Sequence, residues 1–415
     1  MSSTSAPRNG ASLRAPGVVL FLAFVDIFAL LPTVAPHVTD LGAGPAGIGL
    51  AVGAYSAANL PANIVGGILV DRLGRRRVTI AGLLAAAVTV AAYAWATTVG
   101  AFILVRILHG IAGGILVPAV FAAAGDRARR GAEGRAFGRL GAVIGSAAVI
   151  APATAGAVRQ ATGTDAVFLG VAVLLLVGAV VAVIGVHDAT TVTGTPGERA
   201  ARAASPQAMR ALLRLAPIRR ALLGTVVLTM AVGVLAGFLP GTAEALGAPP
   251  SAVGGLFTAY AIVAAGLMLS PLAGRVDRSG ADGPLALGLL TLGGALLLLA
   301  VAPNLTTAVV GSALFGAGYG LIFPAVAAAT SSSSTLATRG RAFGLFNVAF
   351  SLGIAVGPPA IGALAEAVPR LDPFVPTGGL AIGAAVVIAV VSGRGDPPEH
   401  VDEVLEELGE PPAAP

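Results

Sequence analysis

The stretch GILVDRLGRRRV, residues 67–78, marks a place where a long apolar segment ends in a cluster of charge. Residues 67–70 are apolar or glycine, whereas Asp71 and four arginines fill most of the next seven positions. Such an abrupt passage is typical of a helix that leaves the hydrocarbon layer of a membrane on its positively charged side. The stretch therefore predicts a membrane-spanning helix before it and a short basic loop after it.

The composition places the whole chain in a bilayer. Apolar residues make up 56% of the 415 residues and charged residues only 11%, a balance that does not suit a single core surrounded by water. A hydrocarbon layer of about 30 Å needs about 20 apolar residues per helix. The spans predicted on this basis are 16–37, 46–70, 78–98, 100–124, 137–160, 166–186, 220–243, 251–273, 284–302, 305–329, 342–366 and 374–392. We expect an all-α membrane protein with twelve transmembrane helices.

The arginines set the predicted orientation. The chain has no lysine, and 22 of its 25 basic residues fall on one face of the membrane when both termini lie on that face. Basic residues in short loops mark the cytoplasmic side, so we expect both termini to be cytoplasmic in a multi-pass protein of the bacterial cytoplasmic (inner) membrane. Because the basic groups then have this explanation, the formal net charge of +5 does not predict a nucleic-acid partner.

A second copy of the motif lies in the other half of the chain. The pentapeptide GRAFG occurs at residues 134–138 and again at 340–344, 206 positions later. Other matches at this offset are Asp71 and Asp277, Arg72 and Arg278, Gly74 and Gly280, Gly110 and Gly316, Pro152 and Pro358, and Gly156 and Gly362. Six helices, an even number, separate the copies, so the repeat is parallel. Two pseudo-symmetric six-helix bundles of this kind are associated with transporters that bind substrate between the halves.

The repeat divides the chain into five parts. We predict a cytoplasmic N-terminal tail over 1–15, a six-helix bundle over 16–186, a cytoplasmic linker over 187–219, a second bundle over 220–392 and an acidic cytoplasmic tail over 393–415. Within the linker, Ser205 and Pro206 resemble the start of a helix. The apolar residues that follow, among them Leu212 and Leu213, predict a short helix on the membrane surface.

Residues 67–78 resemble the signature between the second and third helices of the major facilitator superfamily. RILHGIAGG, residues 106–114, is similar to the arginine motif of the superfamily's drug:proton antiporters, although His109 stands where they usually carry glutamine. The antiporter motif of their fifth helix is matched less well, because Ala147, Ala151 and Ala155 occupy positions expected to be glycine. The resemblance therefore covers nearly the whole chain for the fold and is weaker for the antiporter mechanism.

The resemblance implies a cytoplasmic gate. In the family, the aspartate of the motif sits against the start of the eleventh helix, whose free N–H groups and dipole favour an anion. The corresponding cluster forms only when the cytoplasmic ends of the halves meet; the alternative is a plain basic loop. The gate residues implied here are Gly67, Asp71, Arg72, Gly74, Arg75, Arg76, Asp126, Asp277, Arg278, Gly340 and Arg341.

Three ionisable residues fall inside predicted spans, where a charge is costly and points to function. Asp26 lies in the middle of the first span, and Arg106 and His109 lie three residues apart in the fourth. We expect these three residues to meet and to couple transport to protons. A carboxylate there can bind a proton on one side of the membrane and release it on the other, and a nearby arginine adjusts its affinity for the proton. His109, because an imidazole ordinarily titrates near neutral pH, can share that task. The alternative is a permanent Asp26–Arg106 ion pair, with His109 bonded to a backbone carbonyl. The positions 206 residues later are Val232, Ser312 and Phe315, so the charge is not duplicated.

Two further groups of residues are predicted to take part in transport. Glycines and prolines allow helices to approach closely or to bend. They are candidate hinge positions, and simple packing between helices is the alternative. These positions are Gly138, Pro152, Gly156, Gly353, Gly357, Pro358 and Gly362. Aromatic and amide side chains suit a broad, mostly apolar pocket. The cavity candidates, each of which has packing between helices as its alternative, are Phe24, Phe28, Asn59, Asn63, Tyr260, Tyr319 and Asn347.

These features favour a secondary active transporter that exports small hydrophobic compounds or drugs in exchange for protons. A transporter of a sugar or another small polar metabolite is the alternative, and a membrane sensor or enzyme is a remote one. The chain lacks cysteine, which excludes thiolate metal sites, and it shows no HExxH spacing, phosphate loop or nucleophile–base pair. We therefore expect no enzyme activity and no cofactor other than the proton gradient, a small-molecule substrate, the lipid bilayer as surroundings, and a monomer.

Overall fold

The computed structural model describes residues 14–125, 133–187, 206–270, 280–334 and 338–392. Eleven helices in these ranges are long and apolar enough to cross a membrane. A bent pair, α1 (Arg14–Ala29) and α2 (Val34–Asp40), gives a twelfth span when counted as one. The all-helical membrane fold predicted from the sequence is therefore confirmed.

The remaining helices follow the predicted spans closely. The first half continues with α3 (Pro45–Leu73), α4 (Arg75–Ala92), the 3-10 helix η1 (Tyr93–Trp95), α5 (Val99–Gly125), α6 (Glu133–Thr162) and α7 (Thr164–Gly185). The second half contains α10 (Ala216–Ala245), α11 (Pro250–Leu269), α13 (Asp282–Ala300), α14 (Leu305–Ser332), α15 (Arg339–Ala367) and α16 (Phe374–Ser392). α10 begins four residues before the predicted span because Pro217, which fits the first turn of a helix, starts it there.

The first span differs from the prediction because it is not one continuous helix over 16–37. α1 and α2 meet at an angle of 42° across residues 30–33. Pro32 lies in this break, and proline removes a backbone donor and its ring crowds the preceding turn. The Thr33 hydroxyl donates to the Ala29 carbonyl at 2.8 Å, which occupies one of the carbonyls that the break releases.

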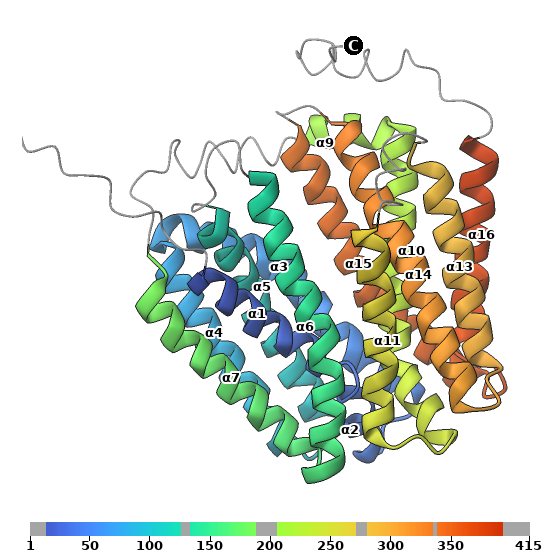
Figure 1. Ribbon diagram of the computed structural model, residues 1–415, viewed down its shortest axis with the longest axis horizontal. Coiled ribbons are helices and arrows are strands. Elements are labelled where there is room, and N and C mark those ends of the chain that lie inside the picture. The colour runs from blue at the N-terminus through green and yellow to red at the C-terminus, as the bar shows by residue number, and fades with distance from the viewer. Residues whose placement is uncertain (1–13, 126–132, 188–205, 271–279, 335–337, 393–415) are drawn as a thin grey trace, which may run out of the picture.

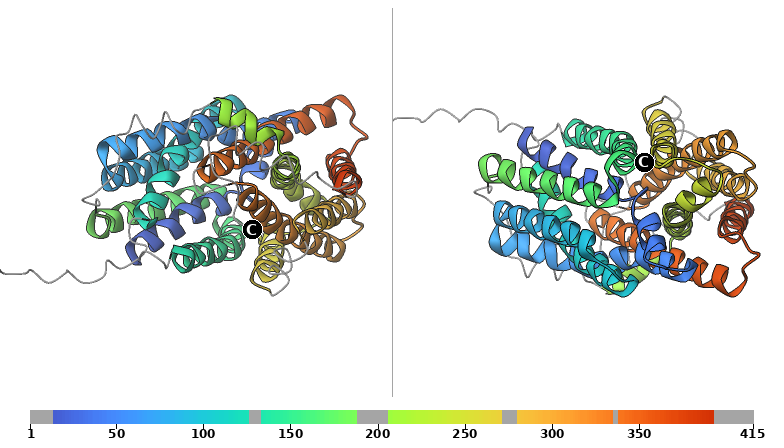
Figure 2. Two further views of the ribbon diagram at one scale, coloured as in Figure 1. Left: turned by 90° about the horizontal axis from the view of Figure 1, so that it is seen from above. Right: turned by 90° about the horizontal axis from the view of Figure 1, so that it is seen from below.

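The two halves repeat one packing scheme, as the repeat in the sequence predicts (Figures 1 and 2). α3 packs on α5 in the first half and α11 packs on α14 in the second, and the pairs α1·α6 and α10·α15 correspond in the same way. At the first of these crossings Gly110 lies against the Tyr55 carbonyl, and at the second Gly316 lies against the Tyr260 carbonyl. Each half has its own large apolar core.

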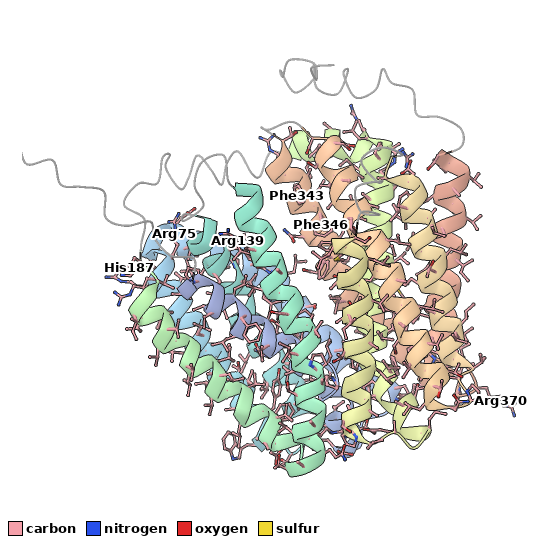
Figure 3. The ribbon with its side chains drawn as sticks, in the orientation of Figure 1. Arg75, Arg139, His187, Phe343, Phe346 and Arg370 are labelled. Carbon is pink, nitrogen blue, oxygen red and sulfur yellow. The ribbon has the colours of Figure 1, made fainter. Side chains whose placement is uncertain are left out.

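We distinguish the two ends of the molecule by the segments they carry. The linker end carries α9 (Pro206–Arg214), Arg75 and Arg139, and the distal end carries α2 and Arg370 (Figures 1 and 3). α9 confirms that the linker contains a short helix. Leu212 and Leu215 of this segment share a small buried cluster with Ala342 of α15, so α9 packs on the second half.

The halves contact each other from the distal end to about mid-helix. α3 packs along α15, and α6 packs along α11. At the distal end the backbone N–H of Ala46 donates to Glu366 at 3.0 Å, and Arg159 pairs with Glu244 at 2.7 Å. Near the middle, the Thr258 hydroxyl donates to the Val149 carbonyl at 2.9 Å. Toward the linker end the ribbons of the two halves diverge (Figure 1).

Candidate functional site

A buried hydrogen-bonded pair joins α1 to α5 inside the first half. Nε2 of His109 lies 2.9 Å from Oδ2 of Asp26, and the two residues are 0% and 3% exposed. The distance is that of a strong hydrogen bond to a carboxylate. The structure thus brings Asp26 and His109 into contact, and both are withdrawn from solvent in this arrangement.

Tyr93 of η1 completes this cluster on the other side of the imidazole. Its hydroxyl oxygen lies 3.0 Å from Nδ1 of His109, and Nη1 of Arg106 lies 3.5 Å from the same oxygen. Tyr93 is fully buried. It was missing from the sequence-based candidates because a tyrosine near the end of a span is typical of the membrane interface; that it is one of only four tyrosines in the chain was the available signal.

Arg106 is not the ion-pair partner of Asp26, so the predicted alternative of a permanent Asp26–Arg106 pair is wrong. Its Nε donates to the Ala51 carbonyl at 2.8 Å, and its guanidinium carbon lies 5.0 Å from the centroid of the Tyr55 ring. Among the described residues, no carboxylate forms an ion pair with Arg106. The partners are exchanged relative to that alternative: the histidine binds the carboxylate, and the arginine binds the backbone carbonyl.

The cluster balances its buried charges across helices. A buried guanidinium needs acceptors for its N–H groups and a negative potential that offsets its charge. The acceptors near Arg106 are the Ala51 carbonyl and the Tyr93 oxygen. The negative face of the Tyr55 ring supplies the potential. On Asp26, Oδ2 is bonded to His109, whereas Oδ1 is buried without a hydrogen-bond partner. An unsatisfied buried acceptor is unusual enough to require an explanation.

The same place in the second half has no charged residue at the equivalent positions, which are Val232, Ser312 and Phe315. Phe315 replaces His109, and its ring packs edge-on against Tyr260 with centroids 5.4 Å apart. From there a row of aromatic contacts continues along α14 and α15 toward the linker end. This aromatic row consists of Phe315, Tyr260, Tyr319, Phe323, Phe346, Phe343 and Phe350.

Most of the aromatic row was missed at the sequence level. Only Tyr260 and Tyr319 were candidates. The signal was present, since Phe315, Tyr319 and Phe323 are spaced by four residues and share one helix face. Figure 3 shows Phe343 and Phe346 in the linker-end part of α15.

The other cavity candidates differ in what their side chains contact. Asn59 donates to the Gly110 carbonyl at 3.3 Å and accepts from Asn63 at 2.6 Å, so these amides are engaged within the α3–α5 contact. Phe24 and Phe28 pack against the apolar core of the first half. Asn347 is exposed. A cavity role for these residues stays a prediction, whereas Tyr260 and Tyr319 belong to the aromatic row.

The candidate hinge residues are mostly positions of close approach between helices. Gly156 meets the Pro250 carbonyl and Gly254 meets the Pro152 carbonyl, where α6 crosses α11. Similarly, Gly362 meets the Pro45 carbonyl. Contacts of α15 with α3 and α10 involve Pro358, Gly353 and Gly357, whereas a Cβ on Gly138 would meet nothing within 4 Å. Packing thus accounts for these residues except Gly138, and bending at them stays a prediction.

The candidate gate residues lie at the linker end. Gly67, Asp71 and Arg72 are in the last two turns of α3, Gly74 has a positive φ of 87° between α3 and α4, and Arg75 and Arg76 begin α4. Gly340 and Arg341 are in the first turn of α15. Arg76 donates to the Val183 carbonyl of α7 at 2.6 Å. Asp126, Asp277 and Arg278 lie outside the described residues, so the gate stays a prediction.

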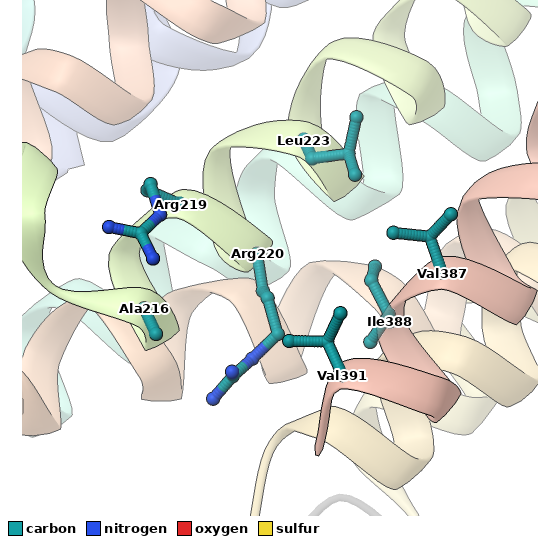
Figure 4. A pocket seen from close by; sticks show the side chains of 7 residues that line it. All are labelled: Ala216, Arg219, Arg220, Leu223, Val387, Ile388 and Val391. Atoms are coloured by element: carbon teal, nitrogen blue, oxygen red, sulfur yellow. The ribbon is translucent and has the colours of Figure 1, made fainter. Parts of the chain in front are cut away.

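A shallow groove between α10 and α16 opens on the outer surface of the second half (Figure 4). Its volume is about 250 Å³, and its walls include Leu223, Val387, Ile388 and Val391. Arg220 at its edge pairs with Asp282 at 3.0 Å. The groove is separate from the buried cluster, and its walls are mainly aliphatic.

The fold and the site define a membrane transporter built from two parallel six-helix bundles. The model of the Major Facilitator Superfamily matches residues 17–223 and 221–415, and the chain belongs to that family. It is accordingly a multi-pass membrane protein of a family of secondary transporters, which are not enzymes.

Curated relatives match only part of the chain. Quinolone resistance protein NorA of Staphylococcus aureus (strain MRSA252) is 24% identical over 169 residues, which are 41% of this chain and 43% of that protein. Multidrug resistance protein 2 of Bacillus subtilis (strain 168) is 28% identical over 137 residues, 33% of this chain and 34% of that one. The matched region thus spans less than half the length of these relatives.

Solved structures share the fold over nearly the whole chain. A bacterial homologue of the human lysosomal transporter Spinster, in an inward-facing and unoccupied conformation, has a TM-score of 0.75 at 15% identity and covers 99% of this chain and 100% of that one. A mutant form of the nucleoside transporter NupG has a TM-score of 0.76 at 15% identity, covering 91% and 98%. At these identities the likeness concerns the fold alone.

Proposed function

We propose that this transporter exports small hydrophobic compounds in exchange for protons. The observation that carries the proposal is the contrast between equivalent positions of the halves. The first half buries Asp26, His109 and Arg106 where the second half has Val232, Phe315 and Ser312. A buried carboxylate held by a histidine suits proton binding, and an aromatic row suits an apolar substrate.

The orientation of the transport cycle follows from the arginines. If the basic linker end is cytoplasmic, the arrangement with the halves joined at the distal end is the inward-facing one. The partial likeness to the proteins named quinolone resistance protein and multidrug resistance protein supports export of drug-like compounds. The main alternative, a sugar transporter, is disfavoured because the amides Asn59 and Asn63 are already bonded to each other and to the backbone.

Proteoliposomes with an acidic lumen test both the substrate class and the coupling. Proton exit should drive uptake of a fluoroquinolone or a neutral lipophilic dye, and a protonophore should abolish it. A monosaccharide, supplied as a parallel substrate, should not accumulate. Accumulation of the sugar, or dye uptake that ignores the pH gradient, would overturn the proposal.

The aromatic row gives a prediction about affinity. Tyr319→Leu and Phe346→Leu each remove one ring from the row while keeping apolar volume, and stacking with an aromatic substrate is worth about 0.5–1.5 kcal/mol per ring pair. We expect KM for the fluoroquinolone to rise about three- to tenfold, with a smaller change in kcat. Initial uptake rates at graded concentrations measure this.

The control for the aromatic-row variants is Trp95→Leu. Trp95 is 68% exposed and is not part of the row, so its substitution should leave KM unchanged. Equal effects in all three variants would show that the row does not contact the substrate.

A further inference from the structure

We infer that Tyr93 and Arg106 act together as a positioning device that fixes the tautomer of His109. His109 then serves as a neutral hydrogen-bond donor to Asp26 and does not carry the proton; the atom that takes the proton is Oδ1 of Asp26. The assignment of the tautomer stands by itself, and the assignment of the transported proton rests on the proposed function.

The first step concerns the hydrogen of the Tyr93 hydroxyl. A guanidinium has only donors, and Nη1 of Arg106 faces the Tyr93 oxygen at 3.5 Å. The positive charge at this distance turns the O–H hydrogen away from the arginine, even though the contact is long for a hydrogen bond. The acceptor at hand is Nδ1 of His109, 3.0 Å away. Tyr93 therefore donates and Nδ1 accepts.

The second step follows from the imidazole itself. A neutral histidine carries its hydrogen on one ring nitrogen only, and the partner of the other nitrogen decides which. With Nδ1 accepting from Tyr93, the hydrogen is on Nε2, and it points at Oδ2 of Asp26 across 2.9 Å. A second proton on Nδ1 would aim an N–H at the Tyr93 hydroxyl hydrogen. Arg106 prevents that hydrogen from turning away, so an N–H on Nδ1 would have no acceptor at the Tyr93 hydroxyl.

Two titratable side chains lie next to the cluster. From α3, the Tyr55 ring packs against both His109 and Arg106. From α2, His37 is one layer farther away, because its ring packs on Phe102 and Phe168, which separate it from Tyr93. α6 and α7 contribute Ala147, Ala151 and Phe168 to the same buried core. None of those three titrates.

The unpartnered oxygen of Asp26 then has a role. Oδ1 is the carboxylate atom that can take a proton without breaking an existing hydrogen bond. When water reaches the site, a proton from hydronium forms one O–H bond at Oδ1 and leaves neutral water behind. The carboxylate becomes a neutral acid, so the net charge of Asp26, His109 and Arg106 changes from zero to +1. No bond within the cluster has to break.

The test of the tautomer is nitrogen NMR on the full chain labelled with 15N-histidine. The chain has four histidines, and subtracting the spectrum of His109→Gln identifies the signals of His109. At neutral pH we expect an unprotonated Nδ1 and a protonated Nε2. A doubly protonated ring, or the opposite tautomer, would overturn the inference.

Two further variants show whether Tyr93 or the Asp26 carboxylate fixes the tautomer of His109. In Asp26→Asn the amide can donate or accept, so Tyr93 alone fixes the ring, and the Nε2–H tautomer should persist. In Asp26→Asn/Tyr93→Phe nothing fixes the ring, and both tautomers should be present. Identical spectra for the single and double variants would show that Tyr93 has no such role. This readout needs no transport, so it is independent of the proposed function.

The proton carrier is tested by rescue. Glutamine can donate an amide hydrogen to Asp26 and accept from Tyr93 with its oxygen, but it does not titrate. We expect His109→Leu to lose pH-driven uptake by about tenfold or more and His109→Gln to restore most of it. If His109→Gln is as defective as His109→Leu while its substrate exchange is intact, His109 carries the proton and the assignment to Asp26 is wrong. If wild-type uptake ignores the gradient, the proposed function fails but the tautomer assignment does not.

Discussion

Replacement of Asp26 by asparagine is expected to abolish accumulation of substrate against its gradient, lowering pH-driven uptake by at least about tenfold. Asparagine has the same shape, and its side-chain oxygen still accepts the hydrogen bond that His109 donates to Oδ2 across 2.9 Å. Packing in the buried cluster is therefore retained. Only the capacity to bind and release a proton is removed, because an amide does not ionise in this range.

The size of this effect follows from the isolation of Asp26 in the membrane. In the tautomer inferred above, His109 only donates to Asp26 and does not take up the proton, and a guanidinium such as that of Arg106 is not deprotonated in proteins. Among the described residues, no second carboxylate shares this cluster. Without Asp26 the outward and inward steps of the cycle no longer differ in proton occupancy, and the gradient does no work on the substrate.

Uptake and exchange, measured in parallel, separate lost coupling from a damaged protein. Asp26→Asn should still exchange labelled for unlabelled substrate at equal concentrations on both sides, at a rate close to that of wild type. Asp372→Asn is the matched control, since Asp372 lies between α15 and α16, outside the spans, where it accepts from the Phe374 backbone N–H at 2.8 Å. Asp26→Asn with normal gradient-driven uptake would contradict the proposed coupling.

Hydropathy and the 206-residue register were sufficient to predict the helices and the two-bundle architecture, because both depend on patterns that the chain repeats many times. Asp26 and His109 could be paired for a related reason, as each lies near the middle of its span and charge at that depth needs a partner. The break at residues 30–33 was not predicted, although Pro32 indicated it, because a proline in a transmembrane helix bends the chain by an amount that packing decides.

The partners of Arg106 could not be predicted from the sequence. Arg106 and His109 share one helix face, so the sequence placed both near Asp26 but did not decide which one would bind it. That choice depends on the Ala51 carbonyl of α3 and on the Tyr93 hydroxyl of η1, both of which lie within reach of Arg106. Every residue has a backbone carbonyl, so the sequence does not show which carbonyl will accept a hydrogen bond. A side chain as long as that of arginine can reach several carbonyls.

The seal at the distal end depends on a glycine. A Cβ on Gly49 of α3 would meet the carbonyl of Pro358 and would lie 3.0 Å from the Cα of Pro359. Both are backbone atoms of α15 and cannot move aside as a flexible side chain would. In Gly49→Val, the two halves therefore cannot close at this end without displacing a helix. Overpacking of this kind costs about 1–3 kcal/mol, enough to shift a two-state equilibrium by about five- to more than a hundredfold.

We expect Gly49→Val to lower transport below about a tenth of the wild-type rate and to favour the state that is open at the distal end. The chain has no cysteine, so a single reporter, Val52→Cys, gives labelling without background. Val52 is 7% exposed and faces Gly237 of the other half, and its reaction with a water-soluble maleimide should be slow in the parent and at least about tenfold faster with Gly49→Val. Gly255→Val is the matched control, because a Cβ there would meet nothing within 4 Å. If Gly49→Val leaves the labelling rate at that of the control, closure at the distal end does not depend on this contact and transport does not require it.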